Sequence, residues 1–429
     1  MFDIYKAYYR TSTSISKAIL EQIRCLLEYT MEGGRCDLNN SAADEPLFIG
    51  VIKESEALDL LYDIHEKVLT LAVMPTILGI GIFGNLTFLI VVVRLQRMRT
   101  IVNYYLANLA VCDALFLLCG VGGKLFRYHY SPIGHNDIYL GNVGCVLLHG
   151  FKDWLYYNSI TTVTFIALDR YMAICMPITH RKVQTKYRAV KFLVASWAIG
   201  FVMSAILAFA HCYLVVFCVD WPDEPRYADL PKFVGFCAPV DDIFNNVATI
   251  FQSVPFIAMM MVNMALYGRI IHAVYTTRRK GTGCLQESTV SDRGQDSRNK
   301  FLVTRMLVIN GVLFFICLAP FELINLVAFI YPDYSDAQTR RNYRTGMRVC
   351  RALMYLNSAL NPYIYSVTNP RYREAFVAVF GCSVLFKSKR GGGSSSSGLA
   401  ASGKYCTGST NALSISRASL NNTQQITRI

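Results

Sequence analysis

The sequence predicts an all-α membrane protein, a bundle of seven transmembrane helices with its N-terminus outside and a short amphipathic eighth helix. Of its 429 residues, 53% are hydrophobic and only 17% are charged, whereas a soluble chain carries about a quarter charged residues. Seven apolar runs are also long enough to cross a bilayer, which takes roughly 20 helical residues each. Because lipid offers the backbone no hydrogen-bonding partners, helices are the expected form of these runs.

The expected spans cover residues 68–93, 103–127, 145–175, 189–213, 244–272, 303–330 and 346–367. They divide the chain into an N-terminal segment (1–67), a transmembrane domain (68–367), an amphipathic helix 8 (368–382) and a tail (383–429). The sequence PRYREAFVAVFG at 370–381 combines basic and apolar residues in a pattern typical of helices that lie on a membrane surface. The loop 278–300 is polar and expected to be flexible, and the serine-rich tail is expected to be disordered.

The distribution of charge predicts the orientation of the chain. The net charge is +13, and basic residues cluster after the first, third, fifth and seventh spans, whereas the loop after the fourth span is acidic. By the positive-inside rule the basic loops are cytoplasmic, so the N-terminus is outside and the chain is a multi-pass protein of the plasma membrane. Basic clusters next to spans favour contact with membrane lipids, not with nucleic acid.

The first 67 residues lack the apolar core of a signal peptide, so the first span is expected to act as an uncleaved signal-anchor. Asn39 begins an Asn-Asn-Ser sequence and is expected to be glycosylated on the outer side.

The fourteen cysteines do not form a disulfide framework, but some face an oxidising compartment. Cys145 opens the third span on the outer side and Cys237 lies in the long outer loop, so these two could form a bridge. The spacing leaves the connectivity open. The other candidates are Cys25, Cys36, Cys212 and Cys218.

Strongly polar residues lie inside the spans, where they are costly and therefore indicate a function. Asp113 lies deep in the second span, and amides and hydroxyls occur in others at Asn85, Ser159, Asn357 and Asn361. Such a set predicts either a pocket for a small cation or a hydrogen-bond network between helices. The sequence favours neither.

Eight markers in order across the seven spans resemble the rhodopsin-like (class A) family of G-protein-coupled receptors. They are Asn85, Asp113, Cys145, the Asp169-Arg170-Tyr171 triplet, Trp197, Pro255, Pro320 and the segment Asn361-Pro362-Tyr363-Ile364-Tyr365. The resemblance extends over roughly residues 68–382 and implies a receptor that activates a heterotrimeric G protein and is regulated by arrestin.

The resemblance also implies roles for matching positions. Asp169 would restrain Arg170 at rest and release it toward the G protein. The whole switch would comprise Asp169, Arg170, Tyr171, Ile178, Asn361, Pro362 and Tyr365. Ligand binding would be transmitted by Ile160, Pro255 and Phe314, the sodium-linked core would be Asn85, Asp113, Ser159, Asn357 and Asn361, and the outer disulfide would join Cys145 to Cys237.

Three departures from the family pattern affect these roles. Leu318 stands in CLAP where many members carry tryptophan, and Asn263 replaces a tyrosine expected to hydrogen-bond Tyr365. The inner end of the sixth span offers Lys300 and Thr304 instead of an acid. Asp169 is therefore expected to be the main ionic restraint on Arg170. With a single restraint, the inactive state is expected to be unusually easy to leave.

The outer half of the bundle predicts the class of ligand. Lys152 stands where amine receptors carry an acid, and the seventh span has no lysine for retinal. Charges of both signs with aromatic residues favour a peptide; an alternative is that Lys152, Asp153, Glu322 and Arg351 neutralise one another. The full set is Lys124, Arg127, Lys152, Asp153, Tyr156, Tyr157, Glu322, Asn325, Arg348, Arg351 and Tyr355.

The motifs NMALY and CLAPF resemble invertebrate neuropeptide receptors of the FMRFamide type. The alternative ligand is a non-peptide small molecule. A transporter is disfavoured because the two halves show no internal repeat, and an enzyme because the spans lack motifs such as HExxH.

The inner end of the chain carries sites for modification and for partners. Cys382 follows the amphipathic helix and is a candidate for palmitoylation. Hydroxyls in the tail are candidate phosphorylation sites that would recruit arrestin. The final residues Ile-Thr-Arg-Ile fit capture of a C-terminal carboxylate by a PDZ-domain protein.

Overall fold

The computed structural model describes residues 47–51, 57–58, 60–134, 136–208, 213–239, 242–281, 291–331 and 337–381. The expected glycosylation and palmitoylation sites, Asn39 and Cys382, lie outside these residues, as do the tail 383–429 and the cysteines Cys25, Cys36 and Cys212.

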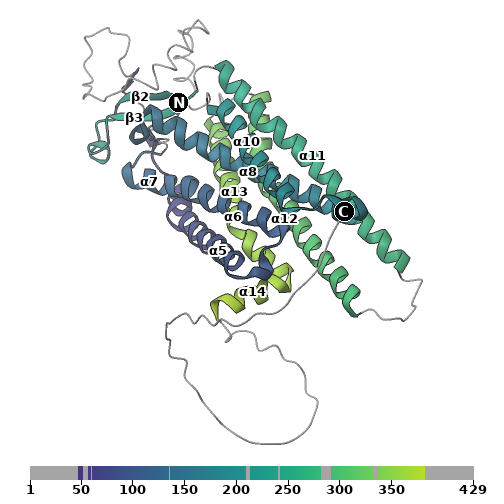
Figure 1. The fold of residues 1–429 in the computed structure, drawn as a ribbon. Coiled ribbons are helices and arrows are strands. Elements are labelled where there is room, and N and C mark those ends of the chain that lie inside the picture. The colour runs from purple at the N-terminus through teal and green to yellow at the C-terminus, as the bar shows by residue number, and fades with distance from the viewer. Residues whose placement is uncertain are drawn as a thin grey trace, which may run out of the picture. The chain divides into compact units, whose positions relative to one another are not determined.

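Seven long helices follow one another in the described part of the chain (Figure 1). The first comprises α4 (Ile64–Val68), a π-helical turn (Leu69–Val73) and α5 (Met74–Arg94). The second comprises α6 (Ile101–Leu117), a π-helical turn (Leu118–Gly122) and α7 (Gly123–Tyr130). The other five are α8 (Gly141–Cys175), α10 (Lys186–Leu207), α11 (Asp242–Gly281), α12 (Ser291–Ile330) and α13 (Ala337–Thr368). The described residues also form two short α-helices, α9 (Pro177–Val183) and α14 (Pro370–Phe380).

Helix ends lie where the local sequence supplies capping groups. The hydroxyls of Thr100 and Thr185 accept hydrogen bonds from first-turn amides of α6 and α10, and the side chain of Asn369 does the same for α14. Gly381 ends α14 in the left-handed conformation, with φ of 65°, which glycine adopts without a steric penalty. These caps fix the entry of the chain into each helix.

The helices confirm the predicted order, but several bounds differ. α10 ends at Leu207 and a strand begins at Tyr213, so the expected fourth span, 189–213, was too long. α11 continues to Gly281 and α12 begins at Ser291, both within the loop expected to be flexible, 278–300. Hydropathy reports only the part of a helix that crosses lipid, whereas the backbone hydrogen bonds of a helix are satisfied equally well in water.

Five helices of the described part are long and apolar enough to cross a membrane: Ile64–Arg94, Ile101–Tyr130, Lys186–Leu207, Asn245–Thr276 and Phe301–Ile330. The other two long helices, α8 and α13, carry several charged residues of the expected ligand site, and α8 also carries those of the switch. The same residues that suggest function therefore lower the hydropathy of these two helices.

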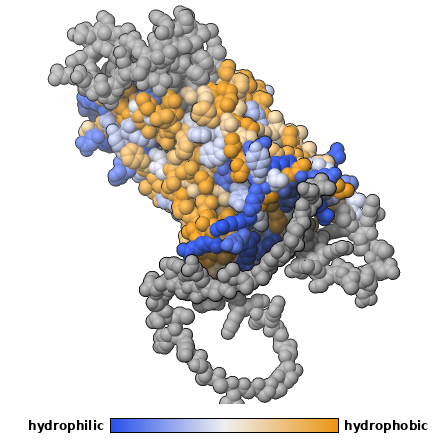
Figure 2. Space-filling model, viewed as in Figure 1, coloured by the Kyte–Doolittle hydropathy of each residue, from blue (hydrophilic) through white to orange (hydrophobic). Residues whose placement is uncertain are grey.

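The seven helices form a closed bundle in which α8 is central. α8 contacts α6, α10, α11 and α12, and α13 closes the ring by packing on α5, α6 and α12. α14 lies across the inner end, against α5 and α13 (Figure 1). Large apolar side chains also point outward, for example Phe83 (66% exposed), Val194 (63%) and Ile316 (61%). Figure 2 shows such residues covering the middle of the bundle, as expected for a surface in lipid.

A small sheet covers the outer end of the bundle. The long outer loop forms a hairpin, with β2 (Tyr213–Asp220) antiparallel to β3 (Phe233–Ala238). A third strand, β1 (Leu47–Val51), pairs parallel with β2, so the strand order is β1-β2-β3. A disulfide joins Cys237 of β3 to Cys145 of α8, with 5.6 Å between the Cα atoms, and fixes the hairpin to the third helix.

Close approach of α8 and α10 depends on Gly200. A Cβ atom at this position would lie 2.9 Å from the carbonyl oxygen of Trp154 and 3.1 Å from the backbone nitrogen of Asn158. Both atoms belong to the backbone of α8, so a local side-chain movement cannot relieve the clash. By contrast, a Cβ at Gly79 of α5 would meet nothing within 4 Å.

We expect Gly200→Ala to lower the free energy of unfolding by about 1–3 kcal/mol, because the extra methyl group forces α10 away from α8. Gly79→Ala is the matched control and should be neutral or stabilising by up to ~1 kcal/mol, because alanine favours helix. Thermal unfolding of the purified proteins in detergent measures both. Equal melting temperatures for the two variants would contradict the packing argument.

Candidate functional site

The buried acid Glu322 links three helices in the outer half of the bundle. Glu322 is on α12 and is fully buried. Its Oε1 accepts a hydrogen bond from the Tyr156 hydroxyl of α8 at 2.6 Å, and its Oε2 accepts one from the Ser253 hydroxyl of α11 at 3.0 Å. Gln252 Nε2 also lies 3.5 Å from Oε1. Neutral donors thus satisfy this carboxylate, and no lysine or arginine of the described chain lies within ion-pair distance.

The alternative of mutual neutralisation receives no support from these contacts. In the described part of the chain no ion pair within 4.0 Å joins Lys152, Asp153, Glu322 or Arg351 to another member of this set. Lys152 Nζ lies 3.4 Å from His149 Nδ1, and the Arg351 guanidinium lies 5.9 Å from the centre of the Phe321 ring.

Two of the expected ligand-binding arginines pair with acids close to the outer surface. Arg127 of α7 forms an ion pair with Asp137, in the loop before α8. Arg348 of α13 pairs with Asp63 and Glu66, each at 2.9 Å, and so ties the seventh helix to the first. Burial raises the pKa of the Asp137 carboxyl above its usual value, and the charge of Arg127 acts in the opposite direction. Ligand contact by either arginine stays a prediction.

The remaining residues of the expected ligand site lie on four helices. Lys124 Nζ lies 5.5 Å from the centre of the Tyr355 ring, in cation–π geometry. The Tyr157 hydroxyl donates to the carbonyl oxygens of Phe251 and Gln252 on α11, at 3.1 and 3.2 Å. Asp153 and Asn325 are half-buried on α8 and α12.

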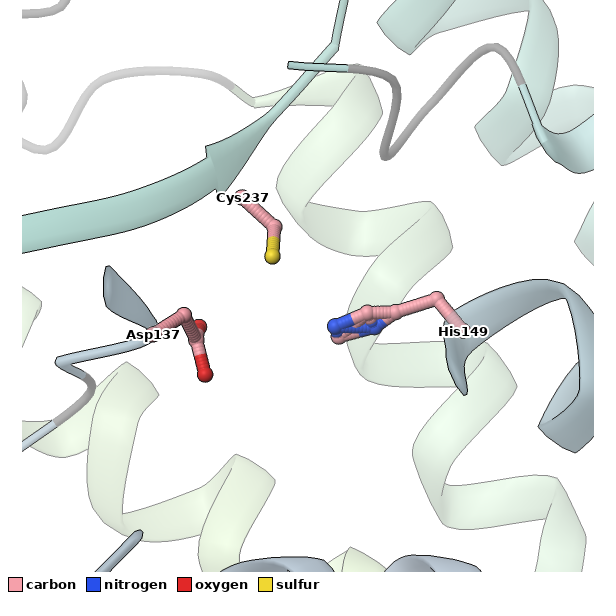
Figure 3. Close-up of side chains that lie close together, drawn as sticks. All are labelled: Asp137, His149 and Cys237. Atoms are coloured by element: carbon pink, nitrogen blue, oxygen red, sulfur yellow. The ribbon is translucent and has the colours of Figure 1, made fainter. Parts of the chain in front are cut away.

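Asp137, His149 and Cys237 come together beneath the sheet (Figure 3). Their potential ligand atoms lie within 4.8 Å of one another. A metal site would require the cysteine as a thiolate, but the sulfur of Cys237 is bonded to Cys145 and the carboxylate of Asp137 pairs with Arg127. This group is therefore part of the framework under the sheet.

The core around Asp113 has the composition of a sodium site. Asn361 Nδ2 donates to Asp113 Oδ2 at 2.6 Å, and Asn85 Nδ2 donates to the carbonyl oxygens of Gly81 and Ser358. A cavity of about 20 Å³ adjoins the carboxylate, and Ser159, Asn357 and Ser358 are among the residues that line it. The buried Oδ1 atoms of Asn85 and Asn361 accept no hydrogen bond from the described protein.

These residues fit a bound sodium ion. Carboxylate, amide and hydroxyl oxygens are the ligands that hard cations prefer, and a cavity of this size holds about one water molecule. If the ion binds, it supplies a positive charge that offsets the buried charge of Asp113. The hydrogen bond from Asn361 also supports the alternative of a network between helices, so the two functions share one set of residues.

The residues between the ligand site and the ion core pack in one apolar cluster. Ile160 and Phe314 both belong to it and are almost fully buried, whereas Pro255 is half-buried next to Phe256, which is a member. Leu318 belongs to the same cluster and lines the Asp113 cavity, so an apolar side chain stands where the family pattern predicts tryptophan. Transmission through these residues stays a prediction.

At the inner end, the Asp169 carboxylate pairs with Arg170, its neighbour in sequence. The same carboxylate lies 3.3 Å from Nε2 of His180 on α9, a contact that the sequence analysis missed. Thr304 of α12 is buried, and no ion pair joins Arg170 to α12 in the described part of the chain; the Lys300 side chain lies outside that part. Tyr171 is half-buried, and Ile178 is 74% exposed at the surface expected to meet the G protein.

The seventh helix carries Tyr365 into a buried cluster at this end. Its ring lies 5.4 Å from that of Phe88 and 6.0 Å from that of Tyr372, and its hydroxyl has no hydrogen-bond partner among the described residues. Asn263 instead donates to Thr164 Oγ1 at 2.8 Å. Asn263, which stands in the place of the expected tyrosine, therefore makes no hydrogen bond to Tyr365 in this structure.

Two other polar residues of the site were not predicted from sequence. Asn108 accepts a hydrogen bond from Trp197 Nε1 at 2.8 Å and donates to Asn158 Oδ1 at 3.0 Å, and so links α6, α8 and α10. Ser253 binds Glu322. Asn108 is a strongly polar residue in the same apolar span as Asp113, which could have identified it, whereas serine is too common in helices for Ser253 to give a signal.

Tyr156→Phe removes a donor from the buried carboxylate of Glu322. Because hydrogen bonds to charged groups contribute about 1.5–3 kcal/mol, we expect a loss of stability in this range. The neighbouring Tyr157→Phe is the control and should cost only about 1 kcal/mol, because its hydroxyl donates to neutral carbonyls. Thermal unfolding in detergent measures both, and an equal loss in the two variants would show that Glu322 does not depend on Tyr156.

Asp113→Asn tests the sodium site without any ligand. We expect sodium chloride to raise the melting temperature of the purified wild-type protein relative to choline chloride at equal ionic strength, because the ion binds only the folded chain. The variant should lose this difference. If Asp113→Asn retains the full sodium effect, the core is a hydrogen-bond network and not an ion site.

Comparison with known proteins identifies the family. Residues 84–365 match the model of the family described as "7 transmembrane receptor (rhodopsin family)". The chain is 25% identical to neurotensin receptor type 1 of Mus musculus over 77% of this chain and 80% of the relative. It is 28% identical to growth hormone secretagogue receptor type 1 of Sus scrofa (70% and 78%) and 25% identical to thyrotropin-releasing hormone receptor of Gallus gallus (80% and 86%). The family consists of signalling receptors of the plasma membrane and not of enzymes. With seven helices, the expected markers and a match over well over half of its length, the chain belongs to the rhodopsin family of seven-transmembrane receptors, the class A G-protein-coupled receptors.

Proposed function

We propose that an extracellular peptide activates this G-protein-coupled receptor, which then promotes nucleotide exchange on a heterotrimeric G protein. The observation that carries the proposal is the outer half of the bundle, where four helices present charged and aromatic side chains, among them Lys124, Asp153, Arg351 and Tyr355. A peptide offers backbone amides together with charged side chains, and this mixed surface can bind both.

The names of the relatives support a peptide ligand. Neurotensin, growth hormone secretagogue and thyrotropin-releasing hormone are the ligands in the three names. The three relatives belong to different receptor types at similar identity, so they support the ligand class and not one ligand. Membership of the FMRFamide-like group stays a prediction, and a non-peptide small molecule is the alternative.

Lys124, Lys152 and Arg351 are the residues proposed to bind acidic or carbonyl groups of the peptide. Glu322 is a less direct candidate for a cationic group, because Tyr156 and Ser253 already donate to it and it is fully buried. A ligand cation that reaches this carboxylate must displace at least one of these donors. Since the donors come from α8 and α11, such displacement would alter the contacts of α12 with both helices.

At the inner end, the proposed G-protein switch is Arg170, with Asp169 as its restraint and Ile178 as an exposed apolar contact. Release of Arg170 must now break a contact to a carboxylate that His180 also binds. We further propose that the N-terminus is outside and that arrestin, a PDZ-domain protein and membrane lipids are additional partners. The tail that would bind arrestin and the PDZ domain lies outside the described residues.

The direct test is nucleotide exchange on purified G proteins by the receptor in lipid nanodiscs, with a library of amidated and free-acid peptides as probes. Exchange driven by any peptide supports the proposal. In parallel, vesicles that contain the protein are assayed for solute flux. Solute flux without nucleotide exchange would show that the protein is a transporter. Exchange driven only by non-peptide compounds would show that the ligand is a small molecule and not a peptide.

Arg170→Ala should abolish exchange, because it removes the guanidinium expected to contact the G protein. Surface expression should remain close to wild type, since among the described residues Arg170 forms an ion pair only with the adjacent Asp169, and the nearby His180 can still bind that carboxylate. Arg94→Ala, an exposed arginine at the end of α5, is the control and should signal normally. Normal exchange by Arg170→Ala would exclude the proposed switch.

A further inference from the structure

Three cations in the outer half of the bundle lack an acidic partner. Lys124 of α7, Lys152 of α8 and Arg351 of α13 form no ion pair within 4.0 Å to any acid of the described part of the chain. They contact aromatic rings and an imidazole, which carry no negative charge. All three side chains are half-buried, and a charge that is partly removed from water is costly when it has no partner.

The three cations also lie close to one another. Tyr355 is one turn inward from Arg351 on the same face of α13, and Lys124 Nζ lies 5.5 Å from the centre of the Tyr355 ring. The positive charges of Lys152 and Arg351 both act on Lys124, and the charge of Arg351 also acts on Lys152. Since like charges repel, this arrangement raises the free energy of the receptor when no ligand is bound.

The acids of the outer half do not neutralise this group. Three of them pair with other arginines, and Glu322 accepts hydrogen bonds from neutral donors on α8 and α11. Asp153 follows Lys152 directly on α8, where neighbouring side chains point in different directions. The charge of Asp153 acts on Lys152, but one acid cannot neutralise three cations. The group therefore keeps a net positive charge.

The outer half of α13 extends the positive surface away from this group. Helix α13 contains no acidic residue, and its outer half carries five arginines: Arg340, Arg341, Arg344, Arg348 and Arg351. The last four are spaced three or four residues apart and so share one face of the helix. A row of charges of one sign guides an oppositely charged ligand toward its site.

We propose that Lys124, Lys152 and Arg351 together bind a carboxylate of the activating peptide. The inference rests on the proposed function, because it assigns a chemical class to the peptide of that site. Both lysine and arginine form charge-assisted hydrogen bonds to carboxylates. The carboxylate comes either from a free C-terminus or from an acidic side chain. A peptide of the FMRFamide type, whose C-terminus is amidated, would need such a side chain.

A bound carboxylate also has a consequence for the helices that carry the group. It would replace the repulsion between α7, α8 and α13 by attraction to a shared negative charge. Binding would therefore favour closer approach of the second, third and seventh helices at their outer ends.

Four tripeptide probes test the proposal: acetyl-Phe-Gly-Phe with a free C-terminus, the same peptide amidated, and amidated acetyl-Phe-Asp-Phe and acetyl-Phe-Arg-Phe. The melting temperature of the purified full-length receptor in detergent is measured with each probe at millimolar concentration. We expect a saturable rise with the free acid, the aspartate peptide or both, which identifies the source of the carboxylate. Equal shifts with acid and neutral amide, no shift with either acid, or a larger shift with the arginine peptide would overturn the proposal.

This measurement does not require G-protein coupling. Acid probes that bind without any peptide-driven nucleotide exchange would contradict the proposed function and leave the carboxylate site intact. Exchange driven only by neutral or basic amidated peptides would do the reverse.

Arg351→Gln removes one cation of the group, and Arg348→Gln on the same helix is its matched control for stability. We expect Arg351→Gln to raise the melting temperature of the ligand-free receptor, because it relieves repulsion. Arg348→Gln should lower it, because Asp63 and Glu66 lose their partner. Arg351→Gln should also weaken the acid probes at least about tenfold through loss of a charge-assisted hydrogen bond.

Arg351→Lys keeps the positive charge and should retain the preference for acid over amide. A lower melting temperature for Arg351→Gln, or an unchanged preference for acid in that variant, would show that these cations stabilise the fold and do not form a carboxylate site.

Discussion

Lipid offers no hydrogen-bonding partner in the middle of the bilayer, so polar groups inside this bundle depend on donors and acceptors from neighbouring helices, and much of the structure follows from that constraint. Glu322 takes its donors from α8 and α11, Asp113 takes one from α13, and Asn108 connects Trp197 with Asn158. Each of these bonds joins different helices. Polar contacts therefore fix the relative positions of helices that apolar packing alone would leave free to slide.

The same contacts form a continuous series of side chains from the outer half of the bundle toward its inner end. Tyr156 donates to Glu322 and its side chain also lines the cavity beside Asp113. Asp113 binds Asn361, one turn before Tyr365. Glu322 is thus separated from the Asp113 cavity by a single aromatic ring, and Asp113 is linked to α13 by one further side chain. Leu318 lines the same cavity in place of the expected tryptophan. The aromatic side chains in its wall are those of Phe116, Tyr156 and Phe314.

The existence, order and approximate positions of the helices could be predicted from the sequence, because a bilayer imposes a minimum apolar length on each span. The partners of Arg348 could not, since Asp63 and Glu66 lie almost 300 residues away along the chain and only the closed ring of helices brings them together. β1 was missed for a similar reason, because a five-residue strand owes its existence to pairing with β2. His180 escaped notice because the sequence places it eleven residues beyond Asp169, and only the turn into α9 brings its ring back to that carboxylate.

The sheet over the outer end restricts how an extended peptide can approach. β1 occupies one edge of β2, and on the far side of β3 the backbone of Gly235 is already bonded: its carbonyl accepts from the Asp137 amide at 2.6 Å and its amide donates to Asn136 Oδ1 at 3.0 Å. Addition of a ligand as a further strand beside the hairpin would require one of these contacts to break. Backbone pairing at this part of the hairpin therefore competes with contacts that the protein already makes, which agrees with the prediction that side chains of the helices below it select the ligand.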